Sequence, residues 1–327
     1  MIIARAPFRI PLGGGGTDLP SYYSQRGGAL ISAALNRYVY ITVNKRFEPS
    51  IRISYSKTEI VEDIDAIEHP IVREALRLLD LRDHLEITSV ADIPANTGMG
   101  SSSTFTVALL LALHSYKREH PSPQALAEEA YHIEREILGE PVGKQDQYAA
   151  AFGGIITMDI APNGKVDVGS IALDDHTLDD FESNLLLFYT GIQRSASGVL
   201  KMQDKAAAES ESDTLARLDR IKEIGADVRK AIQERNLRRF GELMDVHWQT
   251  KKGLSAKIST SNVDKWYELA RTNNALGGKL MGAGGGGFLL FYCDTNKRGL
   301  RDAMASQGLR EVKFHIDWDG AKVVANV

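Results

Sequence analysis

The stretch Pro94-Ala-Asn-Thr-Gly-Met-Gly-Ser-Ser-Ser-Thr104 decides the fold, because it places two glycines and three serines directly before an apolar helical run. Glycines let a backbone approach an anion closely, and a helix that begins near Ser101 supplies free N–H groups and the positive end of a dipole. The serine hydroxyls add donors and a candidate magnesium ligand. A serine-capped helix after a glycine turn accounts for one serine and one glycine, but not for all five residues. The segment therefore predicts a phosphate-binding loop and nucleotide-dependent chemistry.

Composition and charge narrow the class of protein. The chain has 327 residues, 43% of them hydrophobic, and a net charge of −4, so it can bury a sizeable core but has no global basic field. We therefore expect no nucleic acid and no membrane among its partners. The beginning of the sequence, residues 1–7, lacks the apolar stretch of a secretory signal, which predicts a cytoplasmic location. The single cysteine, Cys293, lies in an apolar run and is interpreted as a small core residue.

The pattern along the chain predicts an α+β protein. Runs rich in β-branched and aromatic residues dominate the first hundred residues, and helical periodicity follows from residue 101. The predicted strands are 2–10, 38–43, 51–55, 85–89, 154–159, 166–171, 185–189, 287–292 and 312–316. The predicted helices are 101–117, 123–138, 196–211, 214–234, 237–252 and 297–307. Because strands cluster rather than alternate strictly with helices, we expect two domains, residues 1–184 and 185–327.

Further glycine clusters accompany the serine loop (residues 94–104), and they lie at residues 13–16, 277–278 and 282–287. The last cluster contains Gly-x-Gly-x-x-Gly, but it precedes a predicted strand instead of opening a helix, which argues against a dinucleotide site. Residues 139–144 approach a P-loop, yet their glycines are one residue too close and Lys144 is followed by Gln145. The sequence therefore excludes a P-loop enzyme.

Two carboxylates arrive on adjacent elements, Glu134 in the predicted helix and Asp146 just past a Pro and Gly turn. Phosphoryl transfer to a hydroxyl needs a phosphate cradle, Mg²⁺, a carboxylate that orients the hydroxyl, and a nearby cation, and the chain offers a candidate for each. The alternatives are a helix-capping role for Asp146 and an ion pair of Glu134 with Arg135 or Arg73.

The remaining polar candidates have weaker signals. Arg9, at the end of the first predicted strand, can be carried to the glycine-lined loop, although a strand-end arginine commonly faces solvent. The histidines have no metal-ligand spacing, so we expect no zinc site, and His132 and His247 are interpreted as packing or capping residues.

Taken together, these segments resemble the GHMP kinases, the superfamily of galactokinase, homoserine kinase and mevalonate kinase. Residues 6–13, 94–103 and 279–287 are similar to its first, second and third motifs, in the same order, and the resemblance spans nearly the whole chain. It implies a ribosomal S5-like first domain, a ferredoxin-like α+β second domain, and a cleft between them for ATP and the acceptor.

The resemblance also implies roles for individual residues. Asp146 would face the acceptor hydroxyl with Arg9 beside it, and Ser102 and Glu134 would bind Mg²⁺, with Glu136 as the alternative because the spacing to Asp146 departs from the family pattern. The implied nucleotide-binding residues are Pro94, Gly98, Met99, Gly100, Ser101, Ser102 and Ser103. The implied acceptor-binding residues are Gly15, Gly16, Thr17, Asp18, Gly284 and Gly285.

The first glycine run suggests the acceptor. It keeps the aspartate of the galactokinase motif, Asp18, and lacks the glutamate and histidine, which argues against galactose. Together with residues 248–255, the run looks most like the D-glycero-D-manno-heptose 7-phosphate 1-kinases, which supply nucleotide-activated heptose for bacterial surface polysaccharide. Another sugar such as L-fucose, or a protein that binds ATP and sugar without catalysis, is the alternative. Candidates for holding a distal phosphate are Lys144, Arg194, Lys251 and Lys252.

Overall fold

The computed structural model describes residues 1–193, 197–209, 212–255, 258–282 and 284–327. A large sheet follows the strand order β12-β1-β2-β5-β3-β4, and β6 pairs with the other half of β2 and with β7. The neighbours are antiparallel except for β3 and β5. The strands are β1 (Ile2–Gly13), β2 (Gly28–Lys45), β3 (Ile51–Ser54), β4 (Thr58–Val61), β5 (Leu85–Ala91), β6 (Ile155–Ile160), β7 (Val166–Ser170) and β12 (Lys322–Asn326).

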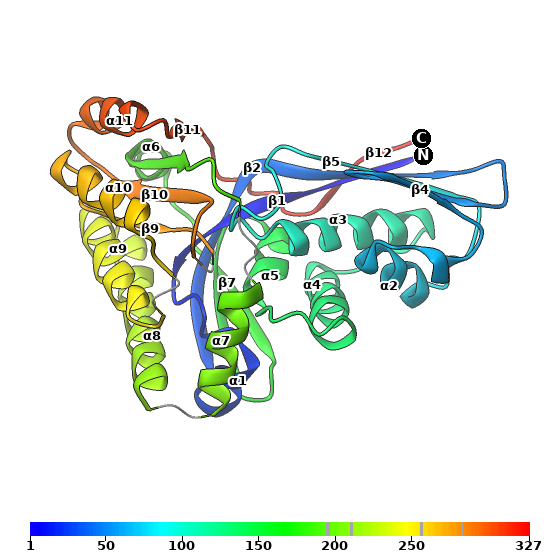
Figure 1. Cartoon of the computed structure of the whole chain (residues 1–327), viewed down its shortest axis with the longest axis horizontal. Helices are drawn as coiled ribbons and strands as arrows, with labels where there is room; N and C mark the ends of the chain where they lie inside the picture. The colour runs from blue at the N-terminus through cyan, green and yellow to red at the C-terminus, as the bar shows by residue number, and fades with distance from the viewer. Residues whose placement is uncertain (194–196, 210–211, 256–257, 283) are drawn as a thin grey trace.

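A small antiparallel sheet in the order β11-β8-β10-β9 lies at the other side of the molecule (Figure 1). Its strands are β8 (Leu185–Tyr189), β9 (Gly277–Leu280), β10 (Phe288–Tyr292) and β11 (Arg310–Glu311). The two sheets and the clustered rather than alternating strands confirm the predicted α+β class.

Helices cover both sheets. On the side of the large sheet lie α1 (Pro20–Arg26), a 3₁₀ turn η1 (Ile64–Ala66), α2 (Pro70–Leu78), α3 (Ser101–Tyr116), α4 (Pro123–Tyr131), a π-helical turn η2 (His132–Ile137), α5 (Gln145–Phe152) and α7 (Ser197–Ala208). Around the small sheet lie α6 (Asp175–Asn184), α9 (Leu237–Lys252), α10 (Ser261–Thr272) and α11 (Lys297–Ser306). Helix α8 (Ser212–Gln233) packs against α9 and against β1 and β2 of the large sheet. No helix in the described ranges combines the length and the apolar character that a bilayer span requires.

The core is continuous across the two sheets. From Ala6 onward every residue of β1 is buried, because α3, α5 and α8 all pack against this strand. One buried cluster joins Phe8 of β1 to Phe240 of α9 and Phe288 of β10, and a second cluster with Trp248 fills the space between the small sheet and α10. Cys293 belongs to this second cluster and is fully buried, as predicted. The site elements are therefore held on a single packed body.

Several elements differ from the sequence prediction. The predicted strand 312–316 is wrong: β11 ends at Glu311, and only Ile316 makes an isolated bridge to Leu35. The unpredicted β12 instead pairs with β1 and completes the edge of the large sheet. The boundary at residue 184 stays a prediction. The elements without a sequence prediction are α1, α2, α5, α6, α10, β4, β9, β11, β12 and the turn η1.

Candidate active site

The serine loop ends in a left-handed residue that turns the chain into α3. Gly100 occupies the position before the helix with φ of 76°, and Gly98 has φ of 78°, a conformation that glycine adopts without strain. No side chain among the described residues caps the helix, so the first backbone N–H groups of α3 are left for a ligand. Ser101, Ser102 and Ser103, which carry them, line the cavity. A helix start of this kind binds anions through its N–H groups and its dipole.

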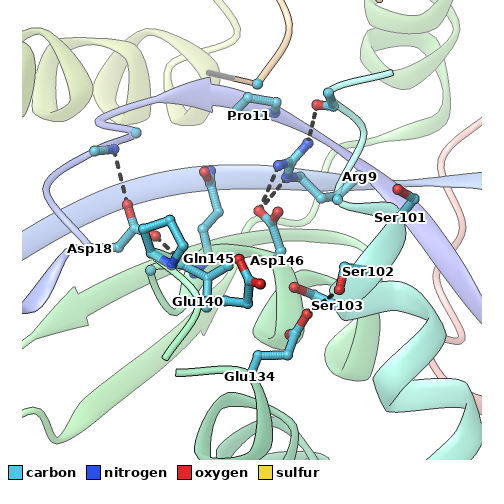
Figure 2. A pocket seen from close by; sticks show the side chains of 18 of the residues that line it. Arg9, Pro11, Asp18, Ser101, Ser102, Ser103, Glu134, Glu140, Gln145 and Asp146 are labelled. Atoms are coloured by element: carbon cyan, nitrogen blue, oxygen red, sulfur yellow. Dashed lines mark hydrogen bonds and ion pairs between the residues drawn. The ribbon is translucent and has the colours of Figure 1, made fainter. Parts of the chain in front are cut away.

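Gly100 brings the loop against Asp146, in the first turn of α5. A Cβ atom at Gly100 would lie 3.0 Å from the Oδ2 atom of Asp146, so only glycine allows this approach. The Arg9 side chain, inside β1 rather than at its end, donates from Nε to Asp146 Oδ1 at 2.7 Å and from Nη1 to the Gly98 carbonyl at 2.9 Å (Figure 2). Arg9 is 5% exposed, so this link is shielded from bulk water. The arginine therefore fixes the carboxylate and the loop relative to each other.

Glu134 lies at the other side of the serines, on the π-helical turn that interrupts the predicted helix 123–138. It is fully buried, accepts from Ser102 Oγ at 2.6 Å and accepts from Gln147 Nε2 at 2.8 Å. A π turn rotates the following residues relative to a regular α-helix, and such turns occur frequently at functional sites. Arg135 pairs instead with Asp204 and Arg73 with Glu74, so neither ion pair considered for Glu134 is formed.

Burial raises the pKa of Glu134 to about 7, and the negative charge of Asp146 adds to the increase, while the hydrogen bonds from Ser102 and Gln147 oppose it. A buried carboxylate of this kind favours a cation as a neighbour.

The hydroxyl of Ser102 and the carboxylate of Glu134 are hard oxygen donors that suit Mg²⁺, which is commonly held by one or two protein ligands and by substrate phosphates. The Oε1 atom of Gln147 beside them is buried and has no hydrogen-bond partner among the residues that the structure describes. No cluster of three or more His, Cys, Asp or Glu side chains suited to a metal occurs within the described ranges. The donor set thus fits a metal ion that is shared with phosphate.

Asp18 marks a separate end of the cavity, and Figure 2 shows Asp146 between it and the group of Glu134 and the serines. Its Oδ1 atom accepts from the Gly16 N–H at 3.0 Å and its Oδ2 atom from the Gln145 N–H at 3.1 Å. Burial raises the pKa of Asp18, and these two N–H donors oppose the increase. A Cβ atom at Gly143 would lie 2.0 Å from Asp18 Oδ2, so a glycine is required where this loop meets the carboxylate.

The C-terminal half contributes basic groups that the sequence interpretation missed or left open. His247 and Lys251 from α9 and Lys279 from β9 all line the cavity. His247 and Lys279 are each 1% exposed, and His247 had been interpreted as a packing or capping residue. The spacing of His247 and Lys251 by four residues, which puts both on one face of a helix, was the signal that could have found them.

Other predicted site residues lie outside the cavity lining. Thr17 is buried and donates to the carbonyls of Gly14 and Ala29, which gives it a role in the loop rather than at its surface. Met99 is a core residue, and Pro94 is exposed. Gly284 and Gly285 lie against Ile258, and Gly285 donates to its carbonyl at 3.1 Å. Glu136, the alternative to Glu134, is exposed and bonds His132.

The remaining predicted residues line one cavity of about 390 Å³. They are Arg9, Gly15, Gly16, Asp18, Gly98, Gly100, Ser101, Ser102, Ser103, Glu134 and Asp146. A free helix start, a fixed arginine–carboxylate pair and a second carboxylate therefore share one cavity. This combination is what transfer of a phosphoryl group to a hydroxyl requires.

The fold and this site define a kinase, and comparisons with known proteins specify the family. Residues 67–154 match the GHMP kinases N terminal domain and residues 228–308 match the GHMP kinases C terminal domain, together more than half of the chain. The chain therefore belongs to the GHMP kinases, which confirms the resemblance and the two-domain GHMP fold.

Individual relatives are similar over most of the chain. D-glycero-alpha-D-manno-heptose 7-phosphate kinase of Campylobacter jejuni is 29% identical over 313 residues, 91% of each chain. The L-fucokinase/L-fucose-1-P guanylyltransferase of Bacteroides fragilis is 27% identical over 92% of this chain and 35% of its own length. The crystal structure of a D-glycero-D-manno-heptose 1-phosphate kinase from B. thetaiotaomicron has a TM-score of 0.83 and 25% identity, with complete coverage of both chains.

Proposed function

We propose that this protein is an ATP-dependent sugar kinase that phosphorylates the anomeric hydroxyl of D-glycero-D-manno-heptose 7-phosphate. The observation that carries the proposal is the contact between the serine loop and Asp146, with Arg9 hydrogen bonded to both. The heptose phosphate acceptor is supported by the relative from C. jejuni, which spans nearly the whole chain. On this proposal the enzyme acts in the cytoplasm, on a small sugar phosphate, and supplies nucleotide-activated heptose for surface polysaccharide.

The described side chains divide the work of the transfer. The backbone N–H groups from Gly98 to Ser103 would bind the ATP phosphates, while Gly15, Gly16 and Asp18 would bind the sugar. Asp146 would accept a hydrogen bond from the anomeric hydroxyl and hold it in line with the γ-phosphoryl group. Arg9 would keep that carboxylate in place and stabilise the negative charge that develops during transfer.

Ser102 and Glu134 would hold Mg²⁺ at the nucleotide end, where Glu134 is buried. When bound, the ion would neutralise phosphate charge during transfer. The burial of Glu134 then has a function, because the cost of a buried charge is offset by a cation.

The test is transfer of the terminal phosphoryl group of labelled ATP to a panel of acceptors. The panel contains D-glycero-D-manno-heptose 7-phosphate, the free heptose, mannose 6-phosphate, L-fucose and galactose. We expect the highest kcat/KM with the heptose 7-phosphate, and phosphorus NMR should identify an anomeric phosphate as the product. Absence of transfer to every member of the panel, with ATP bound, would instead indicate a protein that binds sugar without catalysis.

A kinase for L-fucose is the second candidate, favoured by the similarity to the fucokinase of B. fragilis. The heptose phosphate kinase and the fucokinase are both similar to nearly the whole of this chain, so the identity of the sugar acceptor is what distinguishes the two candidate functions. A higher kcat/KM for L-fucose than for the heptose phosphate would establish the second candidate.

A further inference from the structure

Basic side chains from the C-terminal half meet at one wall of the cavity without matching acidic partners. His247 and Lys251 come from α9 and Lys279 from β9. Neither ring nitrogen of His247 has a hydrogen-bond partner in the part of the chain that the structure describes. The Nζ atom of Lys251 donates to the Gly282 carbonyl at 2.5 Å, which leaves its charge without a counter-ion in this contact.

Lys279 makes no ion pair with any described side chain, although it is 1% exposed. Burial lowers the pKa values of Lys279 and Lys251, that of Lys251 to about 8. Repulsion from Arg9 adds to the effect on both lysines, and repulsion from Lys251 adds to it on Lys279. Buried cations are retained in proteins when an opposite charge pairs with them. No described residue supplies an anion that balances the charge of this wall, so a bound ligand would have to provide it.

The other lysines that the sequence offered are already engaged. Lys144 does not line the cavity: its Nζ lies 2.7 Å from both carboxylate oxygens of Glu128 and 4.7 Å from the ring centroid of Tyr131. Lys252 faces another direction, with Nζ 3.5 Å from Asp264 and 5.9 Å from the ring of Trp248. Arg194 lies outside the described residues.

Two observations bear on which end of the cavity the wall serves. Lys251 lies close enough to Arg9, beside Asp146, and to Asp18, in the proposed sugar-binding loop, for both charges to act on it. The nucleotide phosphates already have the free N–H groups of α3 and the metal ligands. An additional anion is therefore best supplied by the acceptor.

We infer that His247, Lys251 and Lys279 form a subsite that binds the terminal phosphate of the acceptor and selects phosphorylated over unphosphorylated sugars. The inference rests on the proposed kinase function and deepens it. Two ammonium groups and an imidazole provide charge-assisted hydrogen bonds to phosphate oxygens, and the enclosed position strengthens each of them. The phosphate in turn supplies the missing counter-charge.

The test compares Lys279→Met, Lys251→Met and the control Lys252→Met. Methionine keeps the length and packing of the stem while removing the charge. Each protein is assayed with D-glycero-D-manno-heptose 7-phosphate and with the free heptose. We expect Lys279→Met and Lys251→Met to lower kcat/KM for the phosphorylated acceptor by about 100-fold, mostly through KM. Turnover of the free heptose and the KM for ATP should change by less than about threefold, and Lys252→Met should behave as the wild type.

Three results would overturn the inference and leave the kinase activity standing. One is an equal loss with both acceptors, a second is a rise in the KM for ATP, which would assign the wall to the nucleotide, and the third is a wild-type enzyme that does not distinguish the two acceptors. Failure of the wild type to phosphorylate either sugar would refute the proposed function instead.

A binding measurement keeps the subsite testable without turnover. The thermal unfolding midpoint of the wild type should rise with the heptose 7-phosphate and not with the free heptose. Lys279→Met should lose this shift, and its own midpoint without ligand should equal or exceed that of the wild type, because a repelled buried charge has been removed. A shift of equal size in wild type and variant would refute the subsite.

Discussion

At the scale of single residues, the site depends on side chains that are fixed before any substrate arrives. Asp146 has a cation on one side and a glycine that leaves it room on the other. Glu134 is held by a serine and a glutamine. Because these side chains already hold their positions, they need not reorient during the reaction, and this lowers the activation barrier.

Asp146→Asn is expected to lower kcat by about 10²- to 10⁴-fold, because an amide cannot accept the hydroxyl proton or keep the ion pair with Arg9. The affinity for ATP, measured by calorimetry, should stay within about threefold of the wild type. Near-normal turnover in the purified variant would remove Asp146 from its proposed role.

Glu134→Gln is expected to remove most of the activity and to raise the Mg²⁺ concentration that half-maximal turnover requires, because one proposed ligand of the ion is lost. The amide keeps the bond from Ser102, and the unpaired Gln147 Oε1 can accept from it after an amide flip, so the fold should survive. Magnesium titrations of activity, with the unfolding midpoint as the control, check both points. If the variant saturates with Mg²⁺ at the same concentration as the wild type, Glu134 is not a ligand.

The sequence allowed us to select those candidate site residues that belong to a recognisable local motif. The serines, Asp146, Glu134 and Arg9 were found from the loop, the turn and the strand that carry them. Lys279 and His247 were missed because their position depends on how β9 and α9 meet the first half of the chain. Gly284 and Gly285 were assigned to the acceptor, but they lie against Ile258, a contact that no spacing reveals.

At the scale of elements, close backbone contacts join the glycine loops. A Cβ atom at Gly282 would lie 2.6 Å from the Cα atom of Gly98, and one at Gly287 would lie 2.1 Å from the Thr97 carbonyl. The third glycine cluster therefore packs against the serine loop. This contact explains its glycines without a dinucleotide.

Gly282→Ala should destabilise the protein by about 2 to 4 kcal/mol, because φ of 69° disfavours a side chain and the new methyl group overlaps the loop. The KM for ATP should rise as well. The matched control is Gly308→Ala, where φ is 77° but no atom lies within 4 Å, and about 1 kcal/mol is expected. Urea unfolding of both variants measures the difference, and equal losses would show that the packing contact contributes nothing.

A pH-dependent contact joins α3 to α4. The ring of His114 lies between two carboxylates, with Nε2 2.7 Å from Glu129 and Nδ1 2.7 Å from Glu119. The hydrogen bond with Glu129 is the main cause of a raised pKa for His114, and the bond with Glu119 adds to it. A raised pKa stabilises the fold below the ordinary value of 6.5 and the contribution is lost as pH rises through the folded value.

His114→Gln should therefore unfold at a lower temperature than the wild type at pH 6, and the difference should shrink at pH 9. Thermal unfolding at the two pH values checks the sign. A constant difference between the proteins would contradict the role of the histidine charge.

The prediction of helices and strands succeeded where the hydrophobic pattern was long, and it failed where contacts with other elements determine the local structure. The helices 101–117 and 237–252 lie close to α3 and α9, because the first is a long apolar run that follows the serines and the second is a long amphipathic stretch. The prediction of a single helix over 123–138 missed the π turn, since the insertion of one residue into a turn leaves no mark in hydrophobic spacing. The strand 312–316 was wrong because its neighbours left it only one bridge, at Ile316.

At the scale of the whole molecule, the two sheets share a core and the cavity lies where their elements meet. The clustering of strands in the sequence was enough to predict the fold class. The pairing of β12 with the edge of β1 joins residues more than 300 positions apart, so no local sequence pattern could predict it. The wall of basic residues is a product of the same long-range packing.

The groups proposed for transfer and the lysines proposed to bind the phosphate of the acceptor come from different parts of the architecture. Arg9, Ser102 and Asp146 stand on β1, α3 and α5, while Lys251 and Lys279 stand on α9 and β9. An engineer who seeks another acceptor would therefore begin with substitutions at these two lysines and keep β1, α3 and α5 unchanged.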